Sequence, residues 1–147
     1  MAGFEDRFAV KFVGNNPKVR IVDVSVDSFD SWKSSESRHH LMLVNDPSVY
    51  LDEVKKALTH LEGIQFLVYN AGMDPHEKAG GVTGITDRVI RQREAMVFEW
   101  AKSHALSIVW VLAGGYSGGS FTKRDVARLH RITVEESARV YAEGATI

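Results

Sequence analysis

The sequence predicts a single α/β domain of 147 residues, with a parallel sheet between helical layers, a three-layer α/β/α arrangement. β-rich segments and helical patterns alternate along the chain, and crossover helices of this length join parallel strands. Two of the β-rich segments are almost continuously apolar, which is typical of strands covered on both faces. Because no internal repeat or linker divides the chain, we expect one domain over residues 1–147.

The first half of the chain predicts two strands and a helix. Residues 19–26 are rich in valine and isoleucine and predict a strand, followed by a polar surface loop at 27–38. Residues 41–44 predict a short second strand. Across 49–61 the apolar side chains recur mostly every three or four positions, which indicates an amphipathic helix, and Gly63 ends it.

The second half repeats this alternation and adds glycine-rich loops. The predicted elements are strands at 64–69 and 106–113, helices at 87–104 and 122–141, and loops at 70–84 and 114–120. Each loop follows a strand. In parallel sheets the ligand site lies beyond the carboxyl ends of the strands, so we expect the two loops to form the functional site.

The composition is that of an ordinary globular protein and excludes several classes of function. The net charge of -1 gives no electrostatic basis for binding nucleic acid or an anionic membrane surface. The absence of cysteine excludes disulfides and thiolate metal sites, and fits a reducing compartment. Residues 1–13 do not resemble a signal peptide, and no apolar run approaches the roughly 20 residues of a membrane helix. We therefore expect a cytoplasmic protein without nucleic-acid or membrane partners.

Two residues of the first loop are candidates for chemistry. Asp74 follows the strand that ends near Tyr69, and a carboxylate at a strand end can bind a cation or orient a histidine. The alternative for Asp74 is an Asx turn or a cap within a polar loop. His76 comes two residues later, and we expect it to line the same mouth.

The second loop offers a phenol and a possible anion site. Tyr116 follows Gly114 and Gly115, and its hydroxyl could donate a hydrogen bond to a developing oxyanion. An amphipathic tyrosine packed on the sheet edge is the alternative. The loop matches no phosphate-binding motif, but a backbone anion site at the start of the following helix stays open.

The other histidines are expected to be structural. His39 and His40 are adjacent, and we interpret them as a solvated loop pair, because neighbours on a strand point to opposite faces and cannot chelate one ion. His60 and His104 fall near the ends of predicted helices, where a cation is favourable. His130 is expected on a solvated helix face.

Several short motifs occur in a fixed order along the chain. They are residues 67–74 ending in Ala-Gly-Met-Asp, Gly80-Gly81, Gly84-Ile85-Thr86, Arg93-Glu94 and Gly114-Gly115-Tyr116, with weaker matches at 18–25 and 50–52. Together they resemble the histone deacetylase superfamily, in particular its class IV members and bacterial relatives. The resemblance implies the C-terminal half of the arginase/deacetylase fold.

The resemblance also implies roles for individual residues. In that family the aspartate of Ala-Gly-x-Asp is one of three protein ligands of a catalytic zinc ion, and the tyrosine of Gly-Gly-Tyr polarises the acyl carbonyl. By this match Asp74 is a zinc ligand and Tyr116 the oxyanion donor, with Gly72, Gly114 and Gly115 shaping the pocket. The implied reaction is attack of zinc-activated water on an acetylated lysine or polyamine.

The departures from the family predict an incomplete site. The family's Asp-x-His ligands and its pair of base histidines have no counterpart here, and residues 23–25, Asp-Val-Ser, lack the histidine. The match is consistent with a chain that begins just after the Asp-x-His motif, near Gly3. One carboxylate does not hold zinc, so we expect weak zinc binding and no deacetylation by the chain alone.

A half-sheet would also leave an apolar edge open, so we expect a homo-oligomer or a complementary chain to cover it. Two alternatives remain. One is a non-catalytic binding or assembly module with the same fold. The other is a small phosphate- or nucleotide-binding protein that uses the 114–120 loop.

Overall fold

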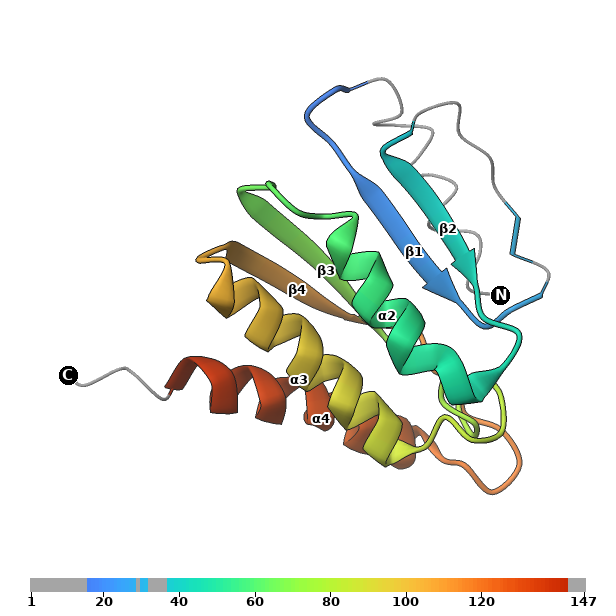
Figure 1. Ribbon diagram of the computed structural model, residues 1–147. Helices are drawn as coiled ribbons and strands as arrows, with labels where there is room; N and C mark the ends of the chain where they lie inside the picture. Colours follow the sequence, from blue (N-terminus) through green and yellow to red (C-terminus); the bar gives the residue numbers. More distant parts are fainter. Residues whose placement is uncertain (1–15, 29, 32–36, 143–147) are drawn as a thin grey trace. The chain divides into compact units, whose positions relative to one another are not determined.

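The computed structural model describes residues 16–28, 30–31 and 37–142, and within them the chain forms four strands, three α-helices and a short 3-10 helix (Figure 1). The strands pair in two parallel sheets of two strands each. The predicted α/β class with parallel strands is therefore confirmed, and the three-layer arrangement stays a prediction. The chain divides into two compact units, residues 1–62 and 63–147. The single domain over residues 1–147 also stays a prediction.

The sheet of the first unit consists of β1 (Ile21–Ser25) and β2 (His39–Leu43), paired in parallel with Ile21 opposite His39. β1 lies within the predicted strand, and β2 begins two residues earlier than the apolar run indicated. At the carboxyl end of the pair, the backbone N–H of Val44 donates to the carbonyl of Ser25 at 2.8 Å.

The helix of the first unit starts with a turn of 3-10 helix, Pro47–Val49, and continues as α2 (Tyr50–Thr59). The carboxylate of Asp46 caps this start by accepting the backbone N–H of Ser48 at 2.8 Å. Of the predicted apolar stripe Val49, Leu51, Val54, Leu58 and Leu61, only Val54 and Leu58 are buried, and Val49 is exposed. Tyr50 and Ala57 complete the buried face of α2. Gly63 follows the helix with φ +81°, a left-handed conformation that glycine adopts without strain.

The second unit is built on β3 (Phe66–Gly72) and β4 (Ser107–Ala113), which pair in parallel along their whole length. The crossover between them is α3 (Asp87–Ser103), and α4 (Lys123–Ala142) follows β4. The two helices lie side by side (Figure 1), joined by ion pairs such as Arg139 with Glu99 at 2.6 Å. The predicted helix at 87–104 matches α3, and the helix predicted to start near residues 122–125 and to run towards Tyr141 matches α4.

The two faces of the β3–β4 sheet differ sharply. On one face Tyr69 and Trp110, which are register partners, each make an edge-to-face contact of 6.0 Å with Phe98 of α3. The opposite face is apolar but exposed, with exposed fractions of 54% for Phe66, 66% for Val68, 50% for Val109 and 47% for Val111. The prediction that these strands are covered on both faces is therefore wrong for the described residues. The apolar run is continuous because both faces carry apolar side chains, although only one is buried.

No described helix combines the length and the apolar character that a membrane span requires.

Candidate functional site

Parallel pairing brings the ends of β3 and β4 to the same edge of their sheet. The ladder continues one residue beyond the strands, where the backbone N–H of Met73 donates to the carbonyl of Ala113 at 3.0 Å. The chain then leaves as two adjacent loops, one carrying Asp74 and the other Gly114, Gly115 and Tyr116. We call these four residues the strand-end site. The sequence predicted this meeting of the two loops from strand order alone.

The carboxylate of Asp74 lies directly against the backbone of the second loop. Its Oδ1 accepts the N–H of Gly115 at 3.0 Å. A Cβ atom built on Gly114 would lie 1.8 Å from Oδ2 of Asp74, so only glycine fits at this position. Gly114 and Gly115 also have φ of +59° and +85°, which side chains of L-residues disfavour. The glycine pair therefore serves both the turn and the close approach of the carboxylate.

Tyr116 is fixed at the same mouth by its backbone. Its N–H donates to the carbonyl of Ala79 at 2.9 Å, which ties the second loop to the first. Its ring lies beside Gly80, where an added Cβ would be 3.1 Å from Cδ2 of Tyr116 and 4.0 Å from the carbonyl oxygen of Asp74. The side chain is 49% exposed. Tyr116 thus borders the loop of Asp74 and remains accessible to solvent.

Gly72 lies close to the carboxylate of Asp74, and an arginine of α3 holds its carbonyl group. A Cβ on Gly72 would be 3.5 Å from Oδ2 of Asp74, and Nη1 of Arg93 donates to the carbonyl of Gly72 at 2.7 Å. The guanidinium also pairs with the buried Glu94, whose Oε1 accepts Nε at 3.0 Å. The Arg93-Glu94 motif therefore anchors the end of β3, two residues before Asp74.

His76 does not line the mouth, and that expectation is wrong. Its side chain is 1% exposed. Nε2 lies 3.0 Å from Oδ1 of Asp87, and Nδ1 accepts the backbone N–H of Lys78 at 3.2 Å. This geometry fits the neutral tautomer with its proton on Nε2. Because both ring nitrogens are engaged, His76 organises the loop and is not placed to bind a metal ion.

His130 was expected on a solvated face, but it is half-buried and points at the second loop. Its Nε2 lies 3.2 Å from the carbonyl oxygen of Gly114. Its Nδ1 is buried and has no hydrogen-bond partner among the described residues. His130 lies four residues after Val126, whose Cγ1 is also near the second loop, 3.3 Å from a Cβ built on Gly115, so both side chains are on the helix face toward that loop.

For the remaining histidines, the prediction was wrong for the pair His39 and His40 and is confirmed for His60 and His104. His39 and His40 belong to β2, so the solvated loop pair is wrong: His39 is buried, and His40 stacks on the ring of His60 at 3.9 Å. The two side chains do point to opposite faces, as their adjacency required. His60 and His104 occupy the C-cap positions of α2 and α3, as predicted.

The described residues do not supply a zinc site by themselves. No group of three or more histidine, aspartate or glutamate side chains among the described residues could hold a metal ion. Asp74 is the one such side chain in the strand-end site, and a catalytic zinc ion needs about three protein ligands. No catalytic step through zinc follows from this arrangement alone.

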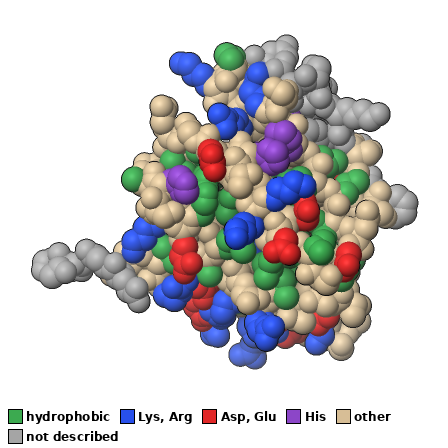
Figure 2. All heavy atoms as spheres, viewed as in Figure 1, with side chains coloured by type: hydrophobic (Ala, Val, Ile, Leu, Met, Phe, Trp, Pro, Cys, Tyr) green, Lys and Arg blue, Asp and Glu red, His purple; other side chains and the backbone are tan. Residues whose placement is uncertain are grey.

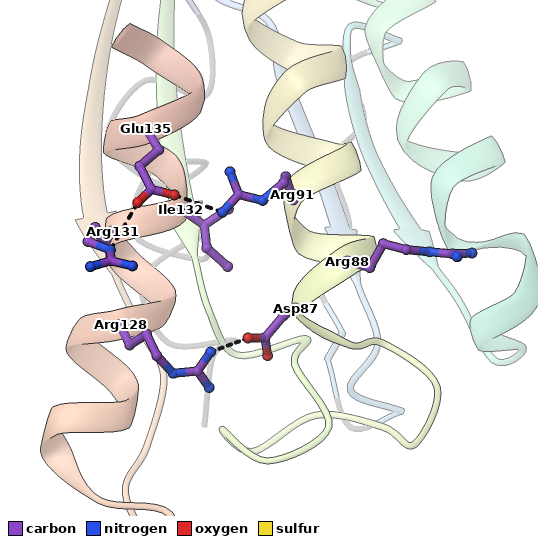
Figure 3. A pocket seen from close by; sticks show the side chains of 7 residues that line it. All are labelled: Asp87, Arg88, Arg91, Arg128, Arg131, Ile132 and Glu135. Atoms are coloured by element: carbon purple, nitrogen blue, oxygen red, sulfur yellow. Dashed lines mark hydrogen bonds and ion pairs between the residues drawn. The ribbon is translucent and has the colours of Figure 1, made fainter. Parts of the chain in front are cut away.

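Two of the pockets that described residues line have charged walls, and neither of these two includes Asp74 or Tyr116. The first, which we call the interhelical pocket, lies between α3 and α4 (Figure 3). Its charged lining is Arg88, Arg91, Arg128, Arg131, Asp87 and Glu135. The second, which we call the basic pocket, belongs to the first unit and is lined by Arg20, Ser37, Arg38, His40, Thr59 and His60, with Pro17 at its rim.

The arginines of the interhelical pocket are largely neutralised. Arg91 donates to Glu135 at 2.7 Å, and Arg131 contacts the same carboxylate at 3.0 Å. Arg128 pairs with Asp87, whose pKa burial alone would raise but which hydrogen bonds from Arg128 and His76 hold below its ordinary value. Figure 2 shows the same mixing of acidic and basic side chains over the region of α3. This pocket is an ion-pair network that stabilises the helix pair.

The chain was also compared with known proteins. No protein-family description matches it, and no curated protein matches it either.

Proposed function

We propose that the chain contributes one part of the active site of a metal-dependent amide hydrolase similar to the histone deacetylase superfamily. In this proposal Asp74 is one ligand of a zinc ion, and Tyr116 stabilises the oxyanion formed from an acetyl-lysine or acetylpolyamine amide. The observation that carries the proposal is the contact between the carboxylate of Asp74 and the backbone of Gly114 and Gly115. It supports the idea that the two motifs act at one place.

The chemistry available to the chain's own residues is limited and specific. Oδ1 of Asp74 is held by the N–H of Gly115, which leaves Oδ2 to coordinate or to accept a further hydrogen bond. The phenol of Tyr116 can donate to an oxyanion that forms at the mouth. Arg93 restrains Gly72 and so limits the movement of the loop that carries Asp74.

The remaining parts of such a site have to be added to these residues. A zinc ion needs further ligands, and the attacking water needs a general base. We propose that another polypeptide segment, with an Asp-x-His motif and paired histidines, supplies both. The zinc ion, when bound, would act as a Lewis acid toward the amide. As part of the same proposal the protein is cytoplasmic, in keeping with its lack of cysteine.

The proposal is tested by reconstitution. The purified chain alone is expected to hold much less than one zinc ion per molecule and to show no turnover of an acetyl-lysine peptide. A polypeptide that carries Asp-x-His and two histidines, encoded beside this chain, should restore stoichiometric zinc and activity. Asp74→Asn should then abolish zinc retention, and Tyr116→Phe should lower kcat while zinc remains bound.

The matched control is Asp52→Asn, which removes an exposed carboxylate from α2 and should leave the reconstituted activity unchanged. Stoichiometric zinc with turnover in the isolated chain would show that the half-site idea is wrong. Full activity of Asp74→Asn in the reconstituted protein would remove the ligand role of Asp74.

An assembly module is the second candidate, and the open face of the β3–β4 sheet favours it. Four large apolar side chains on one face are about half exposed or more: Phe66, Val68, Val109 and Val111. Such a patch is typical of an interface, so we propose that a second copy or a complementary chain covers it. Sedimentation measurements on the chain should then show a dimer or larger species that Val68→Lys dissociates.

A phosphate or nucleotide site at the start of α4 has less support. The carboxylate of Asp125 already accepts the backbone N–H of Thr122 at 2.8 Å and the Thr122 hydroxyl at 2.6 Å. This carboxylate occupies the position at the helix N-terminus that an anion would take.

A further inference from the structure

The basic pocket forms where the amino ends of β1 and β2 meet the carboxyl end of α2. The backbone N–H of Ile21 donates to the carbonyl of Arg38 at 3.2 Å, which extends the strand pairing one residue toward the amino end. Arg20 and Arg38 therefore lie side by side. Because side chains alternate along a strand, His40 falls on the same face as Arg38. The parallel register thus gathers three basic side chains on one surface.

Arg20 also joins the strand end to the helix end. Its Nη1 donates to the carbonyl of His60 at 3.1 Å and to that of Glu62 at 2.7 Å. These bonds satisfy carbonyl groups at the end of α2, where the helix dipole is negative and would otherwise repel an anion. Among the described residues, Nε and Nη2 of Arg20 have no hydrogen-bond partner, so they remain available as donors.

The imidazole rings of the two histidines in the basic pocket are stacked. The rings of His40 and His60 stack with centroids 3.9 Å apart and an angle of 24° between their planes. Burial lowers the pKa of the His40 imidazole, and the proximity of His60 and His39 lowers it further, against a hydrogen bond to the backbone of Ser37. A negatively charged ligand in the pocket would stabilise the protonated imidazole of His40 and so raise its pKa again.

The described side chains that line the pocket are basic or neutral. Its lining contains two guanidinium groups, two imidazoles and the hydroxyl-bearing Ser37 and Thr59, and no described aspartate or glutamate. A metal cation is disfavoured because two arginines flank the histidines and because no described third ligand completes a site. An anion with several oxygen acceptors fits both the charge and the donors.

The size of the pocket narrows the class of anion. Its volume is about 420 Å³, which lies in the range of small-molecule sites and exceeds the needs of a bare phosphate ion. We propose that the basic pocket binds the phosphate group of a small phosphomonoester, with the Arg20 guanidinium and the His40 and His60 rings as its donors. This site is separate from the strand-end site, and the proposal stands independently of the hydrolase function.

Titration calorimetry on the full chain at low ionic strength tests the proposal, with glycerol 3-phosphate, inorganic phosphate and acetate as probes. Glycerol 3-phosphate should bind more tightly than inorganic phosphate, and acetate should bind most weakly. Arg20→Gln should weaken the binding of glycerol 3-phosphate about tenfold, the loss expected for a hydrogen bond to a charged group. The ring resonances of His40 and His60 should shift in the NMR spectrum as the phosphomonoester is added.

Arg88→Gln is the matched control, because Arg88 lines the interhelical pocket and should leave binding unchanged. Since Arg20 also holds the end of α2, a second variant, His60→Gln, should weaken binding too, and circular dichroism verifies that both fold. Equal binding of inorganic phosphate and glycerol 3-phosphate overturns the assignment to a phosphomonoester. The absence of binding, or an equal loss in Arg88→Gln, overturns the site itself.

Discussion

The interhelical pocket and the basic pocket are both lined by arginine, but their arginine side chains contact different partners. Between α3 and α4 the guanidiniums of Arg91, Arg128 and Arg131 each meet a carboxylate, so an incoming anion would have to displace an existing partner (Figure 3). In the basic pocket Arg20 turns to backbone carbonyls and no described carboxylate lines the wall.

The difference teaches how to separate structural charge from functional charge. An arginine that is already paired stabilises the fold and adds little affinity for a ligand, because the exchange of one carboxylate for another anion is close to neutral. Basic groups held together without an acid carry a repulsion that a bound anion would relieve. The distinction depends on partners, and a count of arginines does not reveal it.

Among the arginines that pair with a carboxylate, Arg93 should give the largest loss of stability when it is replaced, because its pair with Glu94 is buried. Arg93→Met should lower the free energy of unfolding by about 3–5 kcal/mol, because it leaves the Glu94 carboxylate buried without its counter-ion and releases the carbonyl of Gly72. Urea denaturation followed by circular dichroism measures the loss. Arg88→Met, at an exposed helix position, should change stability by no more than about 0.5 kcal/mol. Similar values for the two variants would contradict a distinction based on pairing.

The network around Asp87 should give a smaller effect with a defined pH dependence. Asp87→Asn should cost about 1–2 kcal/mol at neutral pH, because it weakens the contacts to Arg128 and His76. The folded pKa of Asp87 lies below its ordinary value of 3.8, so its contribution is present above that pH and is lost as the pH falls through the folded pKa. Thermal melts between pH 7 and about pH 3 should show the variant and the wild type converging. A gap that stays constant on acidification would count against this role.

The basic pocket should give the smallest effect on stability, with a pH dependence near neutrality. His40 shares the pocket with His60, Arg20 and Arg38, and His39 is its chain neighbour; the folded pKa of His40 lies below the ordinary 6.5. Because the unfolded chain takes up this proton more readily, stability should fall as the pH drops below about 6.5 and level off below the folded pKa.

His40→Gln should flatten this pH dependence, measured as the melting temperature between pH 8 and pH 5. Glycerol 3-phosphate should raise the melting temperature of the wild type more at pH 6 than at pH 8, since the bound anion favours the protonated ring. If glycerol 3-phosphate raised the melting temperature of the wild type and of His40→Gln by the same amount, His40 would not be part of the proposed site.

The sequence predicted the elements of the fold better than the surroundings of its histidines. Apolar periodicity located α3 and α4, and the order of strands and helices placed Asp74 and Tyr116 at the ends of neighbouring strands. These features depend on the local apolar pattern and on the geometry of parallel crossovers, and both can be derived from the sequence.

The errors share a physical cause. His76 is buried against Asp87, and His130 contacts the carbonyl of Gly114, through contacts that span 11 and 16 residues. His39 and His40 were assigned to a loop because histidine is a weak strand signal, although pairing with β1 overrode that preference. The apolar run of β3 did not show that one face of the strand is exposed. Residue type alone does not tell whether another element packs against that face.

The fit between Gly114 and Asp74 makes substitutions at the two positions unequal in effect. A Cβ atom at position 114 would overlap the carboxylate in its present position, so a substitution there would also displace Asp74. If Asp74 were lost, the space would open and only the backbone conformation would still favour glycine. A substitution of Asp74 should therefore disturb this edge of the sheet less than a substitution of Gly114, which would displace the carboxylate as well.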